Sequence, residues 1–157
     1  MKIVICNYKN SGNIIPEDVK NSVVDVIKEF NYRIERYGTI KFRNELLDRL
    51  MMKGWSGKVN LSMNSNISIT SIFKNIGLCI QTGNMARMYA DLMKLQAMYM
   101  DNKIKAALFI LPVEECSRSI GSNAAKYERL LNELTNIFSK VITIPMIIIG
   151  FNNDMEK

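Results

Sequence analysis

Hydrophobic positions recur at steps of three and four residues in four stretches of the chain, which is the spacing of an amphipathic helix. Pro16 suits the first helical position, and Gly38 and Gly54 end the first two stretches. Asn84 is a typical N-cap residue ahead of the third stretch. The pattern predicts four helices, over residues 16–37, 39–53, 84–101 and 124–139.

Between residues 57 and 81 hydrophobic and polar positions alternate, which is typical of β-strands. Turn signals at 64–66 and 74–75 divide this region into a three-strand meander. Apolar runs predict three further strands, over residues 1–6, 106–111 and 141–150. A polar loop is expected over 112–123. This order of elements predicts an α/β (α+β) fold in a single domain over residues 1–157, with a mixed central sheet flanked by helices.

The composition excludes several kinds of chemistry. The chain has no histidine, which removes His-dependent nucleophile activation, HNH-type nuclease chemistry and most transition-metal sites. Cys6, Cys79 and Cys116 are widely spaced and form no CxxC pair, so neither a disulfide framework nor a zinc site is expected. No apolar run reaches the roughly 18 to 20 residues that a membrane helix needs. We therefore expect a soluble intracellular protein whose chemistry depends on carboxylates, Lys, Tyr or Gln.

The charge balance favours an anionic partner such as nucleic acid. Lys and Arg outnumber Asp and Glu by 21 to 15, which gives a net charge of +6. Lys41, Arg43 and Arg49 are candidates to follow a DNA backbone, although acidic residues lie between them and a solvated helix face explains them equally well. Arg118 is a further candidate because it lies in the predicted polar loop after a strand.

The end of the third meander strand is the candidate catalytic region. Cys79 and Gln81 are two residues apart and therefore point to the same face, just before the helix that Asn84 begins. Residues 79–81, the loop 119–123, Tyr127 with Glu128, and the ending 144–150 resemble the type II restriction endonucleases of the PD-(D/E)XK superfamily. The whole chain resembles, more closely, a small DNA nuclease of a filamentous virus of hyperthermophilic archaea.

This resemblance implies a DNA endonuclease that acts on double-stranded DNA in the host cell cytoplasm with a divalent cation, Mg²⁺. The superfamily pattern places acids near Thr70 and at Cys79 and a Lys or Gln at Gln81, and only Gln81 matches it. In some members the second acid lies on the following helix. The viral nuclease has a glutamate at the position of Ala86, so the chain resembles an inactivated, acid-to-alanine form.

The resemblance thus implies catalytic roles for position 86 and Gln81, with Lys74 and Arg87 holding phosphate. Asp91 is a second choice as a metal ligand, because it lies five residues after Ala86 and is expected to face a different side of the helix. From the residues alone, alanine needs no explanation in a helix. Two alternatives stay open, a catalytically silent DNA-binding protein with a nuclease-like fold and a viral structural or interaction protein. A double-strand cutter also favours a homodimer on symmetry grounds.

Overall fold

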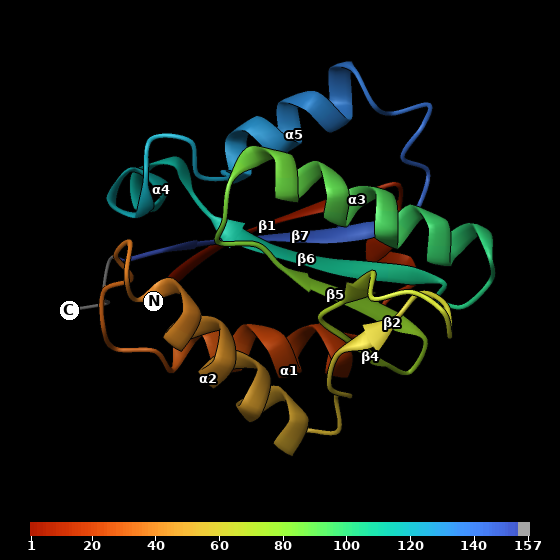
Figure 1. The fold of residues 1–157 in the computed structure, drawn as a ribbon, viewed down its shortest axis with the longest axis horizontal. Helices are drawn as coiled ribbons and strands as arrows, with labels where there is room; N and C mark the ends of the chain where they lie inside the picture. The colour runs from red at the N-terminus through yellow and green to blue at the C-terminus, as the bar shows by residue number, and fades with distance from the viewer. Residues whose placement is uncertain (154–157) are drawn as a thin grey trace.

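The computed structural model describes residues 1–153, in which a five-stranded sheet lies between two layers of helices (Figure 1). The strand order is β1-β7-β6-β5-β4. The three central strands run parallel, and β1 and β4 are antiparallel edge strands. The strands are β1 (Lys2–Tyr8), β4 (Ser71–Phe73), β5 (Ile76–Ile80), β6 (Ala106–Pro112) and β7 (Met146–Asn152). The predicted mixed sheet flanked by helices is confirmed.

The central strands form the core because helices cover both faces of the sheet. All residues of β5 and β6 are buried, so both segments are continuous apolar runs. The alternation predicted for the third meander strand is therefore wrong for β5. Helices α1 (Glu17–Lys28) and α2 (Thr39–Met52) lie on one face. Helices α3 (Met85–Met100) and α5 (Tyr127–Asn136) lie on the other (Figure 1).

The predicted meander is divided at Thr70 into two sheets. Strands β2 (Val59–Asn60) and β3 (Ser68–Ile69) pair with each other in a separate two-stranded sheet. Strand β4 pairs with β5 in the main sheet. Thr70 stays tied to the main sheet, because its N–H donates to the Leu78 carbonyl at 3.0 Å. The side chain of Thr70 thereby faces the end of β5, where Gln81 follows.

The first predicted helix is too long, because α1 ends at Lys28. The Met1 ammonium donates to the carbonyl groups of Lys28 at 3.1 Å and Phe30 at 3.0 Å, which satisfies these acceptors outside a helix. Phe30 and Ile34 are buried as the pattern requires, but they pack from an irregular segment. The apolar spacing continues past Lys28, and for this reason the predicted helix is longer than α1.

Two predictions near the C-terminal half need correction. The expected polar loop over 112–123 contains helix α4 (Glu114–Ile120), whose buried Cys116 and Ile120 are one turn apart. The last strand begins at Met146 rather than at Val141, because the chain turns through Pro145 before it pairs with β6. A short 3₁₀ turn, η1 (Ser11–Asn13), follows β1. Within residues 1–153, no helix combines the length and apolar character needed to span a bilayer.

Candidate functional site

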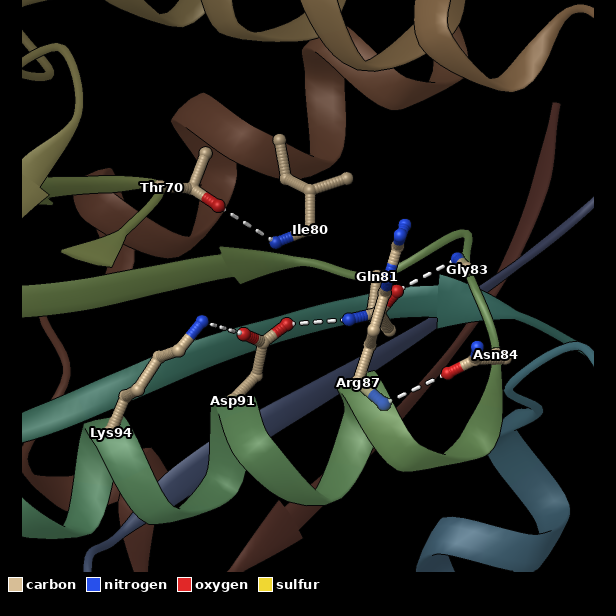
Figure 2. A network of polar contacts seen from close by, with 8 residues as sticks. All are labelled: Thr70, Ile80, Gln81, Gly83, Asn84, Arg87, Asp91 and Lys94. Carbon is tan, nitrogen blue, oxygen red and sulfur yellow. Dashed lines mark hydrogen bonds and ion pairs between the residues drawn. The ribbon is translucent and has the colours of Figure 1, made fainter. Parts of the chain in front are cut away.

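Gln81 occupies the corner between β5 and α3 and is 5% exposed. Its side-chain amide donates to Asp91 Oδ2 at 2.6 Å, and its carbonyl oxygen accepts from the Gly83 N–H at 2.7 Å (Figure 2). A Cβ on Gly83 would come within 2.8 Å of that oxygen, so a larger residue there would displace the Gln81 side chain. The corner is therefore a fixed structure in which one side chain joins β5, the connecting loop and α3.

Helix α3 presents Asp91 and Lys94 to this corner. Asn84 caps the helix, since its side-chain oxygen accepts from the Arg87 N–H at 3.0 Å. Lys94 Nζ lies 2.8 Å from Asp91 Oδ1, so both carboxylate oxygens of Asp91 have a partner (Figure 2). The side chain of Asp91 is only 14% exposed, which makes this ion pair stronger than an open surface pair.

A pocket of about 350 Å³ opens above Asp91, and we call it the Asp91 pocket. Its lining residues come from α2, the β2–β4 region and α3: Arg43, Leu47, Lys58, Ser68, Ile69, Thr70, Asp91 and Lys94. Three of them are cationic and one is anionic. Arg43 and Lys58 make no ion pair within residues 1–153, whereas Lys94 is paired with Asp91. The pocket therefore has an excess of positive charge that is open to an anionic ligand.

The two superfamily acid positions carry neutral side chains here. The Thr70 hydroxyl oxygen accepts from the Ile80 N–H at 3.2 Å (Figure 2). Burial raises the pKa of the Cys79 thiol well above its usual range, and the charge of Asp91 raises this pKa further. A thiol in this state is neither a nucleophile nor a metal ligand. Cys79 is thus a small buried hydrophobic residue at a position where the resemblance to the PD-(D/E)XK superfamily implies a carboxylate.

The donors at this corner do not fit a divalent cation. Mg²⁺ takes oxygen ligands and is commonly held by one or two carboxylates. Here Asp91 is the only carboxylate lining the pocket within residues 1–153, and both of its oxygens already accept hydrogen bonds. No cluster of three metal-ligating side chains occurs in that part of the chain. We therefore derive no reaction step through a bound cation.

A second pocket, of about 520 Å³, lies at the N-terminal end of α3, and we call it the Arg87 pocket. It is lined by Arg36, Thr39, Thr82, Gly83, Asn84, Arg87, Ile120, Gly121, Ser122, Asn123 and Ala124. No carboxylate is among these lining residues. Gln81 separates the two pockets, because its amide nitrogen contacts Asp91 on one side and its carbonyl oxygen contacts Gly83 on the other.

The predicted site residues divide into two groups. Arg43 and Arg87 line the pockets and make no ion pair within the described chain. The other four predicted DNA-binding residues each have a carboxylate partner, in the pairs Lys74–Asp18 (2.6 Å), Lys41–Glu45 (3.7 Å), Arg49–Glu29 (3.4 Å) and Arg118–Glu114 (3.6 Å). Their charges are thereby partly neutralised, and none of the four lines either pocket.

Ala86 is exposed in the first turn of α3, and Asp91 lies roughly 140° away around the helix axis. Asp91 does face a different side from Ala86, as expected, and that side is the one that meets Gln81. The proposal that a glutamate at position 86 is the missing acid stays a prediction. Sequence reasoning missed Lys94, although its position three residues after Asp91 is a recognisable ion-pair spacing. Arg36 and Thr82 gave no local signal.

Comparison with known proteins agrees with this fold. The family described as restriction endonuclease BglII/BglIII matches residues 3–151. The crystal structure of restriction endonuclease BglII with a DNA 16-mer has a TM-score of 0.86 and 15% sequence identity, covering 100% of this chain and 81% of that chain. Free BglII has a TM-score of 0.78 and 16% identity, covering 100% and 82%. No curated protein sequence matches the chain. The chain belongs to the restriction endonuclease BglII/BglIII family.

Proposed function

We propose that this chain binds double-stranded DNA through the face that carries the Asp91 pocket. The observation that carries the proposal is the charge of this pocket, in which Arg43, Lys58 and Lys94 surround a single carboxylate. Phosphate oxygens are the groups that such a set of cations attracts, and phosphate contacts supply most of the affinity of non-specific DNA binding. BglII, which shares the fold, has been crystallised with a DNA 16-mer.

The position of the pocket supports the same function. Arg43 lies on α2, Lys58 precedes β2 and Lys94 lies on α3, so three separate elements bring positive charge to one place. Cations from different elements hold a phosphate in a fixed position, whereas cations along one exposed helix face do not. Binding would release counterions from the DNA, so the affinity should fall steeply as salt is added.

DNA hydrolysis is the second candidate, and family membership favours it, since restriction endonucleases are deoxyribonucleases. The neutral side chains at Thr70 and Cys79 oppose it, because the family reaction depends on a cation that these residues do not hold. Position 86 as the lost acid, an archaeal viral source, a host cytoplasmic location and a homodimer belong to this second proposal. They rest on the resemblance of the sequence and on symmetry.

The test compares DNA binding and DNA cleavage in one set of proteins. Fluorescence anisotropy with a short labelled duplex gives the affinity at several salt concentrations, and supercoiled plasmid with and without Mg²⁺ reports cleavage. The variant Arg43→Ala/Lys58→Ala should lower the slope of log affinity against log salt by about 0.9, which corresponds to one lost phosphate contact.

The matched control is Lys28→Ala/Lys140→Ala, which removes the same charge from exposed residues that line neither pocket. An equal loss of slope in the control would show a general charge effect and contradict binding at the Asp91 pocket. Cleavage by the parent chain in Mg²⁺ would replace the binding proposal with the endonuclease one. No salt-dependent binding at all would leave both without support.

A further inference from the structure

The Arg87 pocket carries a charge that DNA binding at the Asp91 pocket does not use. Arg36 and Arg87 are exposed, and neither makes an ion pair within residues 1–153. Among residues 1–153 no carboxylate lines the pocket, so none of its described lining residues neutralises them. Arginine is the side chain best suited to phosphate, because its planar guanidinium group can donate two parallel hydrogen bonds to two phosphate oxygens.

The Thr82 hydroxyl adds an independent sign of a ligand. Thr82 is 4% exposed and lines the pocket. Its hydroxyl makes no hydrogen bond within the described part of the chain. Every side-chain oxygen or nitrogen there that is fully inaccessible to solvent has a hydrogen-bond partner, so the Thr82 hydroxyl is not one of these atoms. The hydroxyl therefore opens onto the pocket rather than into the core. A buried hydroxyl without a protein partner is costly unless a ligand or solvent satisfies it.

The walls of the pocket are held in place before any ligand arrives. The loop after α4 is fixed to the start of α3, because the Ala125 N–H donates to the Gly83 carbonyl at 2.8 Å and the Met85 N–H donates to the Asn123 carbonyl at 3.2 Å. The segment before Arg36 is fixed by the Ser119 hydroxyl, which donates to the Ile34 carbonyl at 3.2 Å. Binding to a preformed pocket requires little ordering of the backbone.

The charge on α3 strengthens the attraction for an anion. The positive end of the helix dipole lies at this end of α3, and the first turn contains no acidic residue. The Arg87 side chain also lies against the backbone at Gly83, where a Cβ would come within 3.1 Å of Arg87 Cδ. Packing of this kind limits the conformations of the arginine and leaves its guanidinium group near the pocket.

We propose that the Arg87 pocket binds a second phosphate group of the DNA backbone, between the guanidinium groups of Arg36 and Arg87 and within reach of the Thr82 hydroxyl. This inference rests on the proposed DNA binding and adds a second contact to it. Gln81 contacts Gly83 on this side and Asp91 on the other, so the two phosphate sites share one rigid corner (Figure 2). The spacing between the two contacts along the duplex is then fixed by that corner.

The test measures the salt dependence of duplex binding by fluorescence anisotropy. Arg36→Ala/Arg87→Ala should lower the slope of log affinity against log salt by about 0.9, which corresponds to one lost phosphate contact. Thr82→Val, which replaces the hydroxyl by a methyl group, should weaken binding about 10-fold at fixed salt. The control is Lys28→Ala/Lys140→Ala, as above, and its slope should stay at the parent value.

Each outcome separates this inference from the proposed function. In one outcome, the parent chain shows the expected salt dependence while Arg36→Ala/Arg87→Ala has the same slope as the control variant. That result would overturn the second contact and keep DNA binding. A parent chain that does not bind duplex would remove the proposed function, and this inference with it. The last experiment titrates the chain with inorganic phosphate and monitors binding by the NMR shift of the Gly83 amide. Saturation by phosphate with an unchanged duplex slope would assign the pocket to a free anion and overturn the proposal.

Discussion

The Asp91 pocket and the Arg87 pocket lie on opposite sides of Gln81, yet they differ in how their charge is composed. The Asp91 pocket contains a carboxylate that pairs with one of its three cations. The Arg87 pocket contains two arginines and no carboxylate among its lining residues. The first pocket therefore both attracts and repels a phosphate group, whereas the described lining residues of the second only attract it. The acid marks the first pocket as the place where restriction-endonuclease chemistry would be located.

The comparison also separates two parts of an endonuclease, the contact with DNA and the holding of a cation. Family membership and the cationic side chains support the first part. The second part lacks the acids that the superfamily resemblance implies, since Thr70 and Cys79 are neutral and Asp91 is the one carboxylate lining the pocket within residues 1–153. A fold can keep one part without the other, because the cations and the acids come from different elements.

The largest expected effect is a gain of cleavage when both superfamily acids are introduced. Thr70→Asp with Cys79→Glu would place two carboxylates beside Asp91, which gives Mg²⁺ the oxygen ligands that it now lacks. Plasmid cleavage in Mg²⁺ should rise at least about 100-fold above that of the parent. Addition of Mg²⁺ should also raise the melting temperature of the variant, because a bound cation stabilises the folded state.

Two controls make this result specific. Thr70→Asn with Cys79→Gln has nearly the same side-chain volumes without the charges and should stay inactive. Ala86→Glu adds one acid on the exposed side of α3, away from Asp91, and tests the alternative that position 86 carries the lost acid. Cleavage by Ala86→Glu alone would establish position 86 as the essential acid and contradict the location of the chemistry in the Asp91 pocket.

The next effect concerns Gln81, which the two pockets share. Gln81→Met keeps most of the side-chain volume but removes the hydrogen bonds to Asp91 and to the Gly83 N–H. The free energy of unfolding should fall by about 2 to 4 kcal/mol, because two polar groups lose their partners in a buried place. Urea unfolding measures this loss. A change below about 0.5 kcal/mol would show that neither pocket depends on the corner.

Local signals in the sequence predicted the helix and the strands that carry these pockets. The Asn84 cap and the apolar spacing of α3 depend only on residues within one segment, and both predictions are confirmed. A continuous apolar run likewise indicated the buried strand β6, whereas β5 was predicted as an alternating strand of the meander and is buried throughout. Helix α4 was missed because seven residues show less than two full turns of periodicity.

The sequence could not predict which charges meet. Lys58 and Lys94 are 36 positions apart in the numbering and converge only after α3 packs beside the β2–β3 sheet. Arg36 and Thr82 line one pocket although they are 46 positions apart in the numbering. Conversely, Arg49 pairs with Glu29 from a distant part of the chain, whereas Lys41 pairs with Glu45 four residues later on the same helix. Tertiary packing, which periodicity does not encode, decided every case except the Lys41–Glu45 pair.

Cys79 gives an effect that grows with pH. Its thiol has a raised pKa in the folded state because of burial, whereas an unfolded thiol ionises near pH 8.5. The stabilising contribution is therefore complete below about pH 8.5 and is lost as the pH rises further, at up to about 1.4 kcal/mol per pH unit. Burial likewise raises the pKa of Cys116 to about 12, so a second thiol should contribute in the same direction.

Urea unfolding between about pH 7 and 10 tests the state of this thiol. Cys79→Ala should remove one proton equivalent from the alkaline slope, Cys116→Ala should remove another, and the double variant should remove both. An unchanged slope in Cys79→Ala would mean that the thiol ionises in the folded chain. A second negative charge would then lie close enough to interact with Asp91 and Arg43 at alkaline pH, and the contrast between the pockets would increase with pH.

The smallest expected effect tests the repulsion between the Asp91 carboxylate and a DNA phosphate group. Asp91→Asn removes the only carboxylate that lines either pocket within residues 1–153 and releases Lys94 from its ion pair. Two unit charges about 4 Å apart in water interact by roughly 1 kcal/mol, so DNA affinity without Mg²⁺ should rise about fivefold. Asp101→Asn is the matched control, because Asp101 pairs with Lys103 at the far end of α3. Weaker binding by Asp91→Asn, seen only in Mg²⁺, would instead mean that Asp91 holds a cation against the DNA, and the Asp91 pocket would then be a catalytic centre rather than a phosphate clamp.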